Sequence, residues 1–333
     1  MLNIACRKLL VVFSLVTLGC ISVSGSAEPI PINLIVVDGP GEGYNDPVLG
    51  PARLGAMQYT ANLWGSFFEK TFPTQAVDVR VAMDPLANTS TVDVLGFSNA
   101  PRGLVPPARE LQTTVSHLEM LLERRFPTLI PSIVMDSTED FYLGTVGSPG
   151  GKYDFVTTAL HEFGHLFGMI TGLNPNGRYD MQPDGRETPS YYDFFVVNDN
   201  LDQLVNLSPA ERIAAATSRT GLFWFGTNGF EANGEEPILL QANVPYDPLE
   251  NVIHISELNP GTLMDPLKDV NEVVHSLSPA ERGIFQDLGW TLAPLQVELV
   301  SEPGTVLLVL CGLAGLAYSR RRRGQPDVSD VVV

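Results

Sequence analysis

The pattern of apolar and polar positions predicts the elements of the first half of the chain. Residues 32–37 form a short β-branched run closed by Asp-Gly, which predicts a buried strand and a turn. Residues 51–72 carry apolar side chains at helical spacing and predict a long helix packed on that strand. Residues 77–83 alternate and predict a second strand, and residues 91–97 are a weaker candidate for a third.

The following segments lead to a second long helix. Residues 111–126 are amphipathic, and residues 132–146 predict one or two further strands. Residues 153–169 then have the spacing of a single helix, with Asp154 suited to cap its N-terminus. These elements predict an α+β fold whose N-terminal part holds a mixed sheet and two long helices.

The second half of the chain is less regular. Turn residues interrupt it often, and residues 207–217 are its best-marked helix, with a serine N-cap, a proline at the first position and a capping-box glutamate. The hexapeptide Leu-Ser-Pro-Ala-Glu-Arg of that helix start recurs at 277–282, and because the flanking residues differ we interpret it as two similar helix starts. We expect an N-terminal subdomain over 28–170 and a smaller, irregular helical subdomain over 171–298.

The first 27 residues predict a secretory signal peptide. Arg7 and Lys8 precede an apolar run over 9–23, and small residues then offer a cleavage site at residue 27. A lipoprotein signal ending at Cys20 is the alternative, although a threonine stands where that signal usually has an aliphatic residue. Either interpretation predicts export.

The other end of the chain has the features of a membrane anchor. An apolar run over 305–318 is followed by four arginines at 320–323, which is the positive-inside pattern. Residues 299–323 resemble the PEP-CTERM sorting signal of Gram-negative bacteria, although Ser301 replaces the first proline and a tail over 324–333 follows. The resemblance implies a transient transmembrane anchor, processing by an exosortase and a place at the cell surface or in the extracellular matrix. A GPI signal is the alternative, but it would end in its apolar run.

Composition narrows the classes of function. The formal net charge of −18 argues against nucleic acid or an anionic membrane as a partner, and it suits an exported protein or one that binds divalent cations. All three cysteines lie in the two terminal segments, so the rest of the chain cannot rely on disulfides. They are Cys6, Cys20 and Cys311.

A calcium site is conceivable in the acidic region after the second long helix. Asp180, Asp184 and Glu187 could supply oxygen ligands to Ca²⁺. Their spacing is not that of an EF-hand loop, and solvated turn residues are the simpler interpretation.

The predicted helix over 153–169 carries the sequence HExxH. His161 and His165 lie four residues apart and therefore on one face, where they can present two imidazole nitrogens to one metal ion. Glu162 lies one step round, in the position of a general base in a zinc peptidase. The alternative is a chance occurrence of the motif on an amphipathic helix.

A catalytic zinc ion needs a third protein ligand. The chain has five histidines, and His117 precedes the motif, which leaves His254 and His275 as candidates. Thr171 stands at the position where the short metzincin pattern places its third histidine. The ligand must therefore come from farther along the chain.

The arrangement around these residues resembles the leishmanolysin group of metzincins. In that family HExxHxxG is followed by an insertion, a distant third histidine and a methionine turn, and Gly168, His254 and Met264 stand in matching positions. The resemblance implies a zincin fold with one catalytic Zn²⁺ bound by the two motif histidines and His254, and Met264 beneath the metal. The chain departs from the family in having no cysteines in this region.

The resemblance implies an exported zinc-dependent endopeptidase in which Glu162 is the general base. A protein or peptide substrate would lie extended along an edge strand, which we expect near 141–145. Two alternatives remain open. One is a surface or extracellular-matrix protein that keeps the zincin fold without catalysis, and the other is a metal-dependent hydrolase acting on a different bond.

Overall fold

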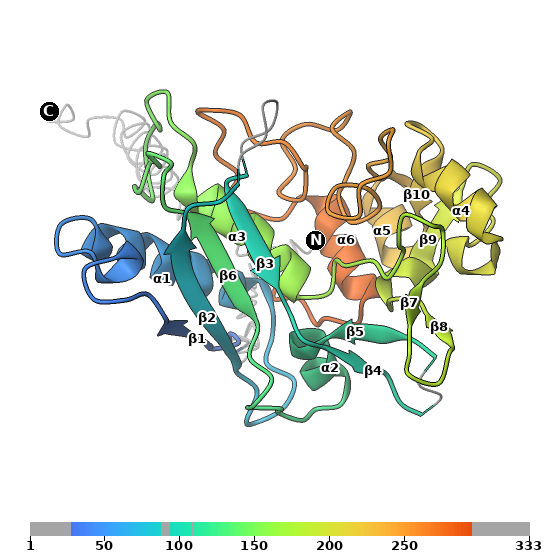
Figure 1. The fold of residues 1–333 in the computed structure, drawn as a ribbon, viewed down its shortest axis with the longest axis horizontal. Coiled ribbons are helices and arrows are strands. Elements are labelled where there is room, and N and C mark those ends of the chain that lie inside the picture. Colours follow the sequence, from blue (N-terminus) through green and yellow to red (C-terminus); the bar gives the residue numbers. More distant parts are fainter. Residues whose placement is uncertain (1–27, 88–93, 108–109, 295–333) are drawn as a thin grey trace, which may run out of the picture. The chain divides into compact units, whose positions relative to one another are not determined.

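The computed structural model of the chain describes residues 28–87, 94–107 and 110–294. These residues form strands and helices together (Figure 1), so the predicted α+β class is confirmed. The described residues up to Ala293 belong to one compact unit, which contains both predicted subdomains. None of the helices described is long and apolar enough to span a membrane, and the predicted signal peptide and sorting signal lie outside the described residues.

The main sheet has four strands in the order β1-β2-β6-β3. Its strands are β1 (Ile32–Val36), β2 (Val77–Asp84), β6 (Ser132–Asp136) and β3 (Gly96–Asn99). The first three run parallel, and β3 pairs antiparallel with β6 at the edge of the sheet. Strands are therefore confirmed at the first two predicted positions. Of the third candidate, 91–97, the last two residues lie in β3, and residues 91–93 lie outside the described part of the chain.

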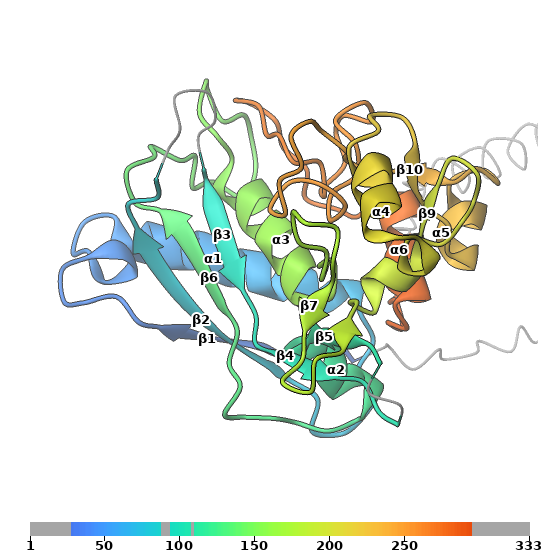
Figure 2. The same ribbon diagram turned by 45° about the vertical axis from the view of Figure 1, so that its right-hand side comes forward.

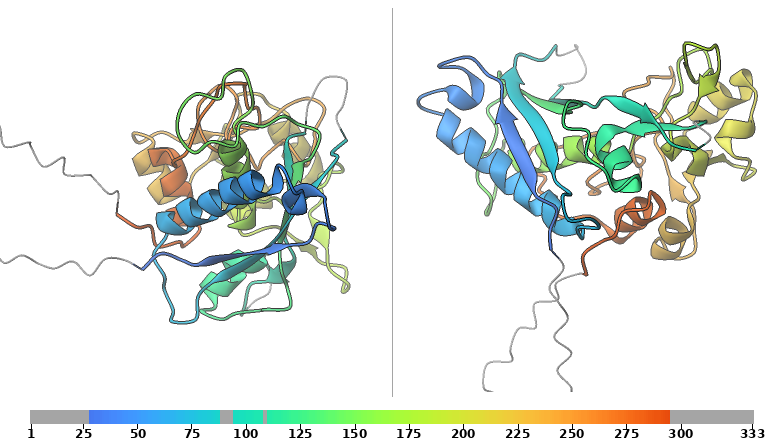
Figure 3. Two further views of the ribbon diagram at one scale, coloured as in Figure 1. Left: turned by 90° about the vertical axis from the view of Figure 1, so that its left-hand side faces the viewer. Right: turned by 90° about the horizontal axis from the view of Figure 1, so that it is seen from below.

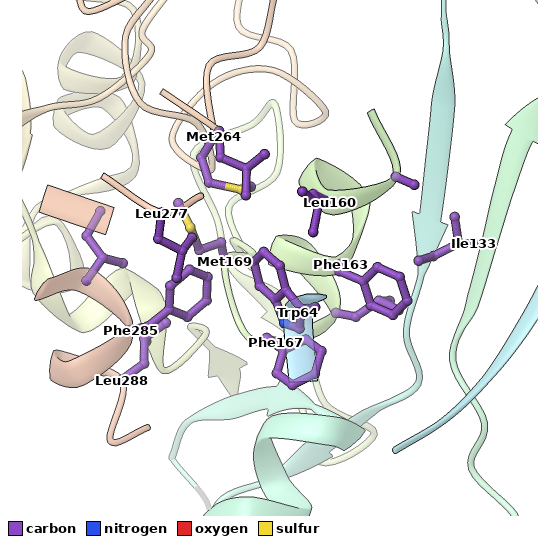
Figure 4. Close-up of a cluster of buried hydrophobic side chains, with 14 of the residues drawn as sticks. Trp64, Ile133, Leu160, Phe163, Phe167, Met169, Met264, Leu277, Phe285 and Leu288 are labelled. Atoms are coloured by element: carbon purple, nitrogen blue, oxygen red, sulfur yellow. The ribbon is translucent and has the colours of Figure 1, made fainter. Parts of the chain in front are cut away.

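Two long helices cover one face of this sheet (Figures 1 and 2). They are α1 (Gly50–Phe67) and α3 (Phe155–Leu166), and they pack against each other. Trp64 of α1 is fully buried, with its ring centroid 6.3 Å from that of Phe163 on α3 and 5.5 Å from that of Phe167, the C-cap of α3. Figure 4 shows this aromatic cluster between the two helices and Phe285. Burial of such large side chains fixes how α3 lies on α1.

Both ends of the described unit lie against the end of α1 (Figure 3). The amide of Lys70 donates to the carbonyl oxygen of Glu28 at 2.9 Å, and the amide of Ala293 donates to that of Phe67 at 2.9 Å. These bonds explain why α1 ends at Phe67, five residues before the predicted end at residue 72. Phe68 already has extended backbone and forms a bridge with Leu292.

The edge strand of the sheet differs from the predicted one. We expected strands through residues 132–146, with the edge near 141–145, but the structure has β6 alone, followed by an irregular segment. In that segment Tyr142 folds over Gly144, where a Cβ atom would lie 2.3 Å from the tyrosine ring. Glycine is therefore required there, and the segment forms an isolated bridge between Tyr142 and Asp154 instead of a strand. The edge beside α3 belongs to β3.

A hairpin and a short helix replace the predicted amphipathic segment over 111–126. The hairpin pairs β4 (Arg102–Leu104) with β5 (Gln112–Thr114), and α2 (Val115–Leu121) follows directly. Thr114 caps this helix, because its side chain accepts from the amide of His117.

The rest of the described unit consists of short elements, as the irregular pattern predicts, but it holds short strands as well as helices and is not the helical subdomain that we expected. A three-stranded sheet has the order β11-β10-β9, and the hairpin β7-β8 stands beside it. The strands are β7 (Asp180–Met181), β8 (Glu187–Thr188), β9 (Val196–Asn198), β10 (Leu222–Trp224) and β11 (Ile238–Leu239). The helices are α4 (Pro209–Ala216), α5 (Thr227–Ala232) and α6 (Pro279–Asp287), with 3₁₀ turns η1 (Gly43–Asn45), η2 (Tyr192–Phe195) and η3 (Leu204–Asn206).

Candidate metal centre

The sequence motif lies on α3, which is buried along its whole length. The side chain of Asp154 accepts from the amide of Thr157 at 2.7 Å, so the predicted N-cap is confirmed. At the other end Gly168 has φ +121°, and a Cβ atom there would lie 3.1 Å from Nδ1 of His117. Glycine therefore allows the chain to leave the helix with its last turn, and His165, in place.

Three histidine side chains meet at one point beside α3. The Nε2 atom of His254 lies 3.0 Å from that of His161 and 3.2 Å from that of His165, and the two motif nitrogens are 3.2 Å apart. Nitrogens this close together can all lie about 2.0–2.1 Å from one ion, which is the usual Zn–N distance. The structure thus brings together the three predicted ligands, and all are buried.

The hydrogen bonds of these rings fix their protonation. The Nδ1 atom of His161 donates to the carbonyl oxygen of Leu263 at 2.8 Å. His165 donates in the same way to Met169 at 2.7 Å, and His254 to Glu250 at 2.8 Å. A ring that carries its proton on Nδ1 and remains neutral presents a lone pair on Nε2.

The electrostatics agree with neutral rings. Burial lowers the pKa of His165 to about 4. Burial also lowers the pKa of His161 and of His254 well below the ordinary value, with the charge of His165 acting in the same direction. Three lone pairs therefore face one another without a proton between them, and a cation is the group that such an arrangement binds.

Glu162 lies beside these nitrogens and is 7% exposed. Burial raises its pKa to about 7, while a hydrogen bond from the Ser98 side chain acts against that rise. Gly96 makes room for the carboxylate, because a Cβ atom there would lie 3.1 Å from Oε1 of Glu162. A carboxyl group with a pKa near neutrality is suited to accept and return a proton.

Met264 packs against α3, and Figure 4 shows it in the buried cluster beside Leu160. A Cβ atom on Gly164 would lie 2.3 Å from its sulfur, so the methionine fills the space that this glycine leaves. The amide of Met264 donates to the carboxylate of Glu281 at 2.7 Å, which ties the segment to α6. The neighbouring Leu263 supplies the carbonyl that holds His161. The segment of Met264 is therefore packed against the helix that carries the two motif histidines.

Thr171 and the two remaining histidines have other partners. The hydroxyl of Thr171 donates to the buried carboxylate of Asp193 at 2.6 Å. His275 contacts Asp154 at 2.7 Å, at the start of α3 and away from the three nitrogens. His117 is buried and donates from Nε2 to the carbonyl oxygen of Leu288 at 2.6 Å.

The three acidic residues considered for calcium are occupied by arginines. Asp180 pairs with Arg102 at 2.7 Å, and Asp184 pairs with Arg186 at 2.8 Å. Glu187 accepts from two further arginines, Arg178 at 2.9 Å and Arg212 at 3.0 Å. Within the described residues the histidine cluster is the single group arranged to hold a metal ion, so the calcium hypothesis finds no support here.

A cavity of about 510 Å³ opens onto the three histidines and Glu162. Strand β3 lines one side, and residues 248–250, 253–254 and 266–269 line another. Burial raises the pKa of Glu250 in this wall to about 7, with the charges of Asp247 and Glu257 adding to the effect. The cavity is large enough for several residues of an extended chain to enter.

Several residues that support this site were not predicted. Ser98 and Gly96 belong to a strand whose pairing could not be read from its sequence, and the contact of Glu281 with Met264 is a long-range one. A capping-box pattern marks Glu281 locally but says nothing of its tertiary partner.

Comparison with known proteins adds no further assignment. No protein-family model matches the chain, and no curated protein matches its sequence. The interpretation of the site therefore rests on its own geometry.

Proposed function

We propose that the protein is a zinc-dependent endopeptidase of metzincin type. The observation that supports this most directly is the set of three Nε2 lone pairs, separated by 3.0–3.2 Å, with Glu162 beside them. Three nitrogen ligands and an open side toward a cavity are typical of a catalytic zinc site, whereas a structural zinc site uses four protein ligands. Nitrogen ligands without carboxylates favour zinc over magnesium or calcium.

Each residue then has a defined role. His161, His165 and His254 would hold one Zn²⁺ as neutral imidazoles, and the ion would acidify a water molecule and polarise the scissile carbonyl. The Glu162 carboxylate accepts the proton of that water and returns it to the leaving amine. Met264 supports the motif histidines from below and takes no part in the proton transfers.

The substrate would bind along β3, since this is the edge strand that lines the cavity. The carbonyl oxygen of Leu95 accepts from the amide of Asp136, so the main-chain groups of Leu95 face β6. Successive residues of a strand alternate in direction, and the main-chain groups of Gly96 and Ser98 therefore face the open edge. A peptide in extended conformation can bond to them whatever its side chains are.

Replacing Glu162 by alanine tests the proposal. The Glu162→Ala protein should keep about one zinc per chain and lose most of its casein-type proteolysis, since the carboxylate acts on water and does not ligate the metal. Zinc content and proteolysis are measured on the same samples. Loss of zinc together with activity would instead indicate a ligand, and an inactive wild type with bound zinc would favour a non-catalytic protein of this fold.

The third ligand is tested by a pair of histidine variants. His254→Ala should weaken zinc binding by more than the roughly 10- to 100-fold expected for a residue that only supports a ligand. His275→Ala removes a contact at the helix start and should leave zinc binding nearly unchanged. The reverse result would show that the assignment of the distant ligand is wrong.

We also propose that the protein is exported and transiently anchored, on the basis of its two terminal segments. The exported form should then lack residues 1–27 and the segment beyond about residue 303. Intact-mass analysis of the exported material measures this, and retention of the arginines at 320–323 would contradict processing by an exosortase-type enzyme.

A further inference from the structure

One residue near His254 has an unusual backbone. The described residues include five non-glycine residues with positive φ, and four of them are exposed: Glu123, Leu201, Glu235 and Asn271. The fifth, Val252, has φ +78° and is fully buried. A β-branched side chain is rarely found in this region because its methyl groups crowd the backbone. Such strain persists only where surrounding contacts enforce it, and it concentrates at functional sites.

Contacts from three separate segments enforce the turn at Val252. The hydroxyl of Tyr192 donates to the carbonyl oxygen of Val252 at 3.1 Å, and the amide of Val252 donates to Gln241 at 2.8 Å. The side-chain amide of Asn251 donates to the carbonyl oxygens of Ala216 and Asn243, each at 2.7 Å. Tyr192 is itself buried, with its ring centroid 4.7 Å from that of Trp224.

The turn places two groups that the metal centre needs. Glu250 lies two residues before Val252, and His254 lies two residues after it. The carbonyl oxygen of Glu250 accepts from Nδ1 of His254. The bend at Val252 therefore brings an acceptor under the ring that follows, which fixes both the orientation and the tautomer of His254. A relaxed backbone at Val252 would separate the two groups and turn Nε2 away from the other two ligands.

We infer that Tyr192 is a positioning residue for the third metal ligand, holding the strained turn at Val252 so that His254 faces the two histidines of α3. The inference rests on the proposed metal site. Together with Asn251, the tyrosine links η2 to that site. The region between α3 and His254 supplies no ligand of its own. Through Tyr192 it contributes to metal affinity.

A matched pair of tyrosine variants tests this role. Tyr192→Phe keeps the ring on Trp224 and removes only the hydroxyl. Tyr246→Phe is the control, since the Tyr246 hydroxyl also donates to a main-chain carbonyl, that of Leu173 at 2.8 Å. That carbonyl lies outside the turn at Val252 between Glu250 and His254, which we call the ligand turn. In the full-length protein, titrated with zinc against a competing chelator, Tyr192→Phe should raise the Kd about tenfold or more. Tyr246→Phe should change it by less than about threefold, because it does not touch the ligand turn.

A glycine at position 252 separates positioning from general support. Glycine adopts a positive φ without steric cost, so a Val252→Gly protein needs the Tyr192 hydroxyl less. The effect of Tyr192→Phe on the zinc Kd should therefore fall from about tenfold to about twofold in the Val252→Gly background. An undiminished effect would show that the hydroxyl supports the fold without acting through the turn.

A second pair of variants covers the case in which Tyr192→Phe fails to fold. Asn251→Ala removes both anchors on the other side of the turn and should also raise the zinc Kd about tenfold. Asn233→Ala is its control, since the Asn233 amide likewise donates to two carbonyls, far from the ligand turn in sequence. If Tyr192→Phe and Asn251→Ala both leave the Kd within about threefold of wild type, the inference is wrong. If the wild type itself binds no zinc, the proposed metal site falls and the inference with it.

Discussion

The hexapeptide Leu-Ser-Pro-Ala-Glu-Arg occurs at 207–212 and at 277–282, and the two copies have different roles in the structure. Both begin a helix in the same way. Ser208 caps α4 and Ser278 caps α6, each with a complete capping box and a proline at the first helical position. The local conformation is thus determined by the six residues themselves.

In each copy of the hexapeptide a different charged residue is buried and bonded to the rest of the protein. Glu281 is fully buried and accepts from the amide of Met264, whereas Glu211 is exposed and bonds only within its own cap. Conversely, Arg212 is buried and donates to three carbonyl oxygens and to Glu187, while Arg282, among the described residues, donates to the carbonyl of Ala293. The same sequence therefore supports the metal centre in one place and a loop region in the other, depending on what packs against it.

A large difference in stability between the two copies should appear when the glutamate of each is replaced by alanine. Glu281→Ala leaves the buried amide of Met264 and the partly buried amide of Ser278 without an acceptor. At about 1–3 kcal/mol for the first and about 1 kcal/mol for the cap, it should lower the free energy of unfolding by about 3 kcal/mol. Glu211→Ala loses only part of a cap and should cost about 1 kcal/mol. Urea denaturation of the metal-free proteins measures both. Equal losses would mean that the contact with Met264 contributes nothing.

The two arginines should show a difference of similar size in the opposite direction. Arg212→Ala removes a buried cation and leaves Glu187 with Arg178 and the amide of Tyr179, and we expect a cost of about 3 kcal/mol, at the lower end for a broken buried pair because Glu187 is partly exposed. Arg282→Ala should cost about 1 kcal/mol, since it loses one hydrogen bond. Thermal unfolding of the matched variants checks the order, and a larger loss for Arg282→Ala would reverse the comparison.

The smallest effects should be equal in the two copies. Ser208→Ala and Ser278→Ala each remove a hydroxyl that accepts from the third helical amide, at 3.4 and 3.2 Å, and each should cost about 1 kcal/mol. Denaturation midpoints of the two variants should shift by similar amounts. A clearly larger shift for one serine would show that its helix start depends on tertiary contacts and not on the hexapeptide.

Local patterns predicted the elements that depend on few residues. The helix carrying His161 and His165, its cap at Asp154 and the strands β1 and β2 all follow from periodicity within one segment. The edge strand could not be predicted in this way, because a segment becomes an edge only through the strand it pairs with. Within residues 141–145 the structure has an isolated bridge from Tyr142 to Asp154, whereas β3 pairs with β6. Prediction of His254 required the resemblance to a family, since nothing in its own segment points toward α3.

The supports of the site could not be predicted from the sequence at all. Tyr192 and Glu281 act through single hydrogen bonds to residues far along the chain, and neither pattern nor propensity specifies such a partner. The positive φ of Val252 is likewise imposed by its surroundings against its own preference.

The contact between Gly164 and Met264 implies a relation between distant positions in evolution. A methyl group at position 164 would lie 2.3 Å from the methionine sulfur, so the two residues occupy one shared volume. A lineage that gained a side chain at the first position would have to lose atoms at the second, and the order of the two changes would matter. In any set of related chains these positions should therefore vary together, even though one belongs to a helix and the other to a loop.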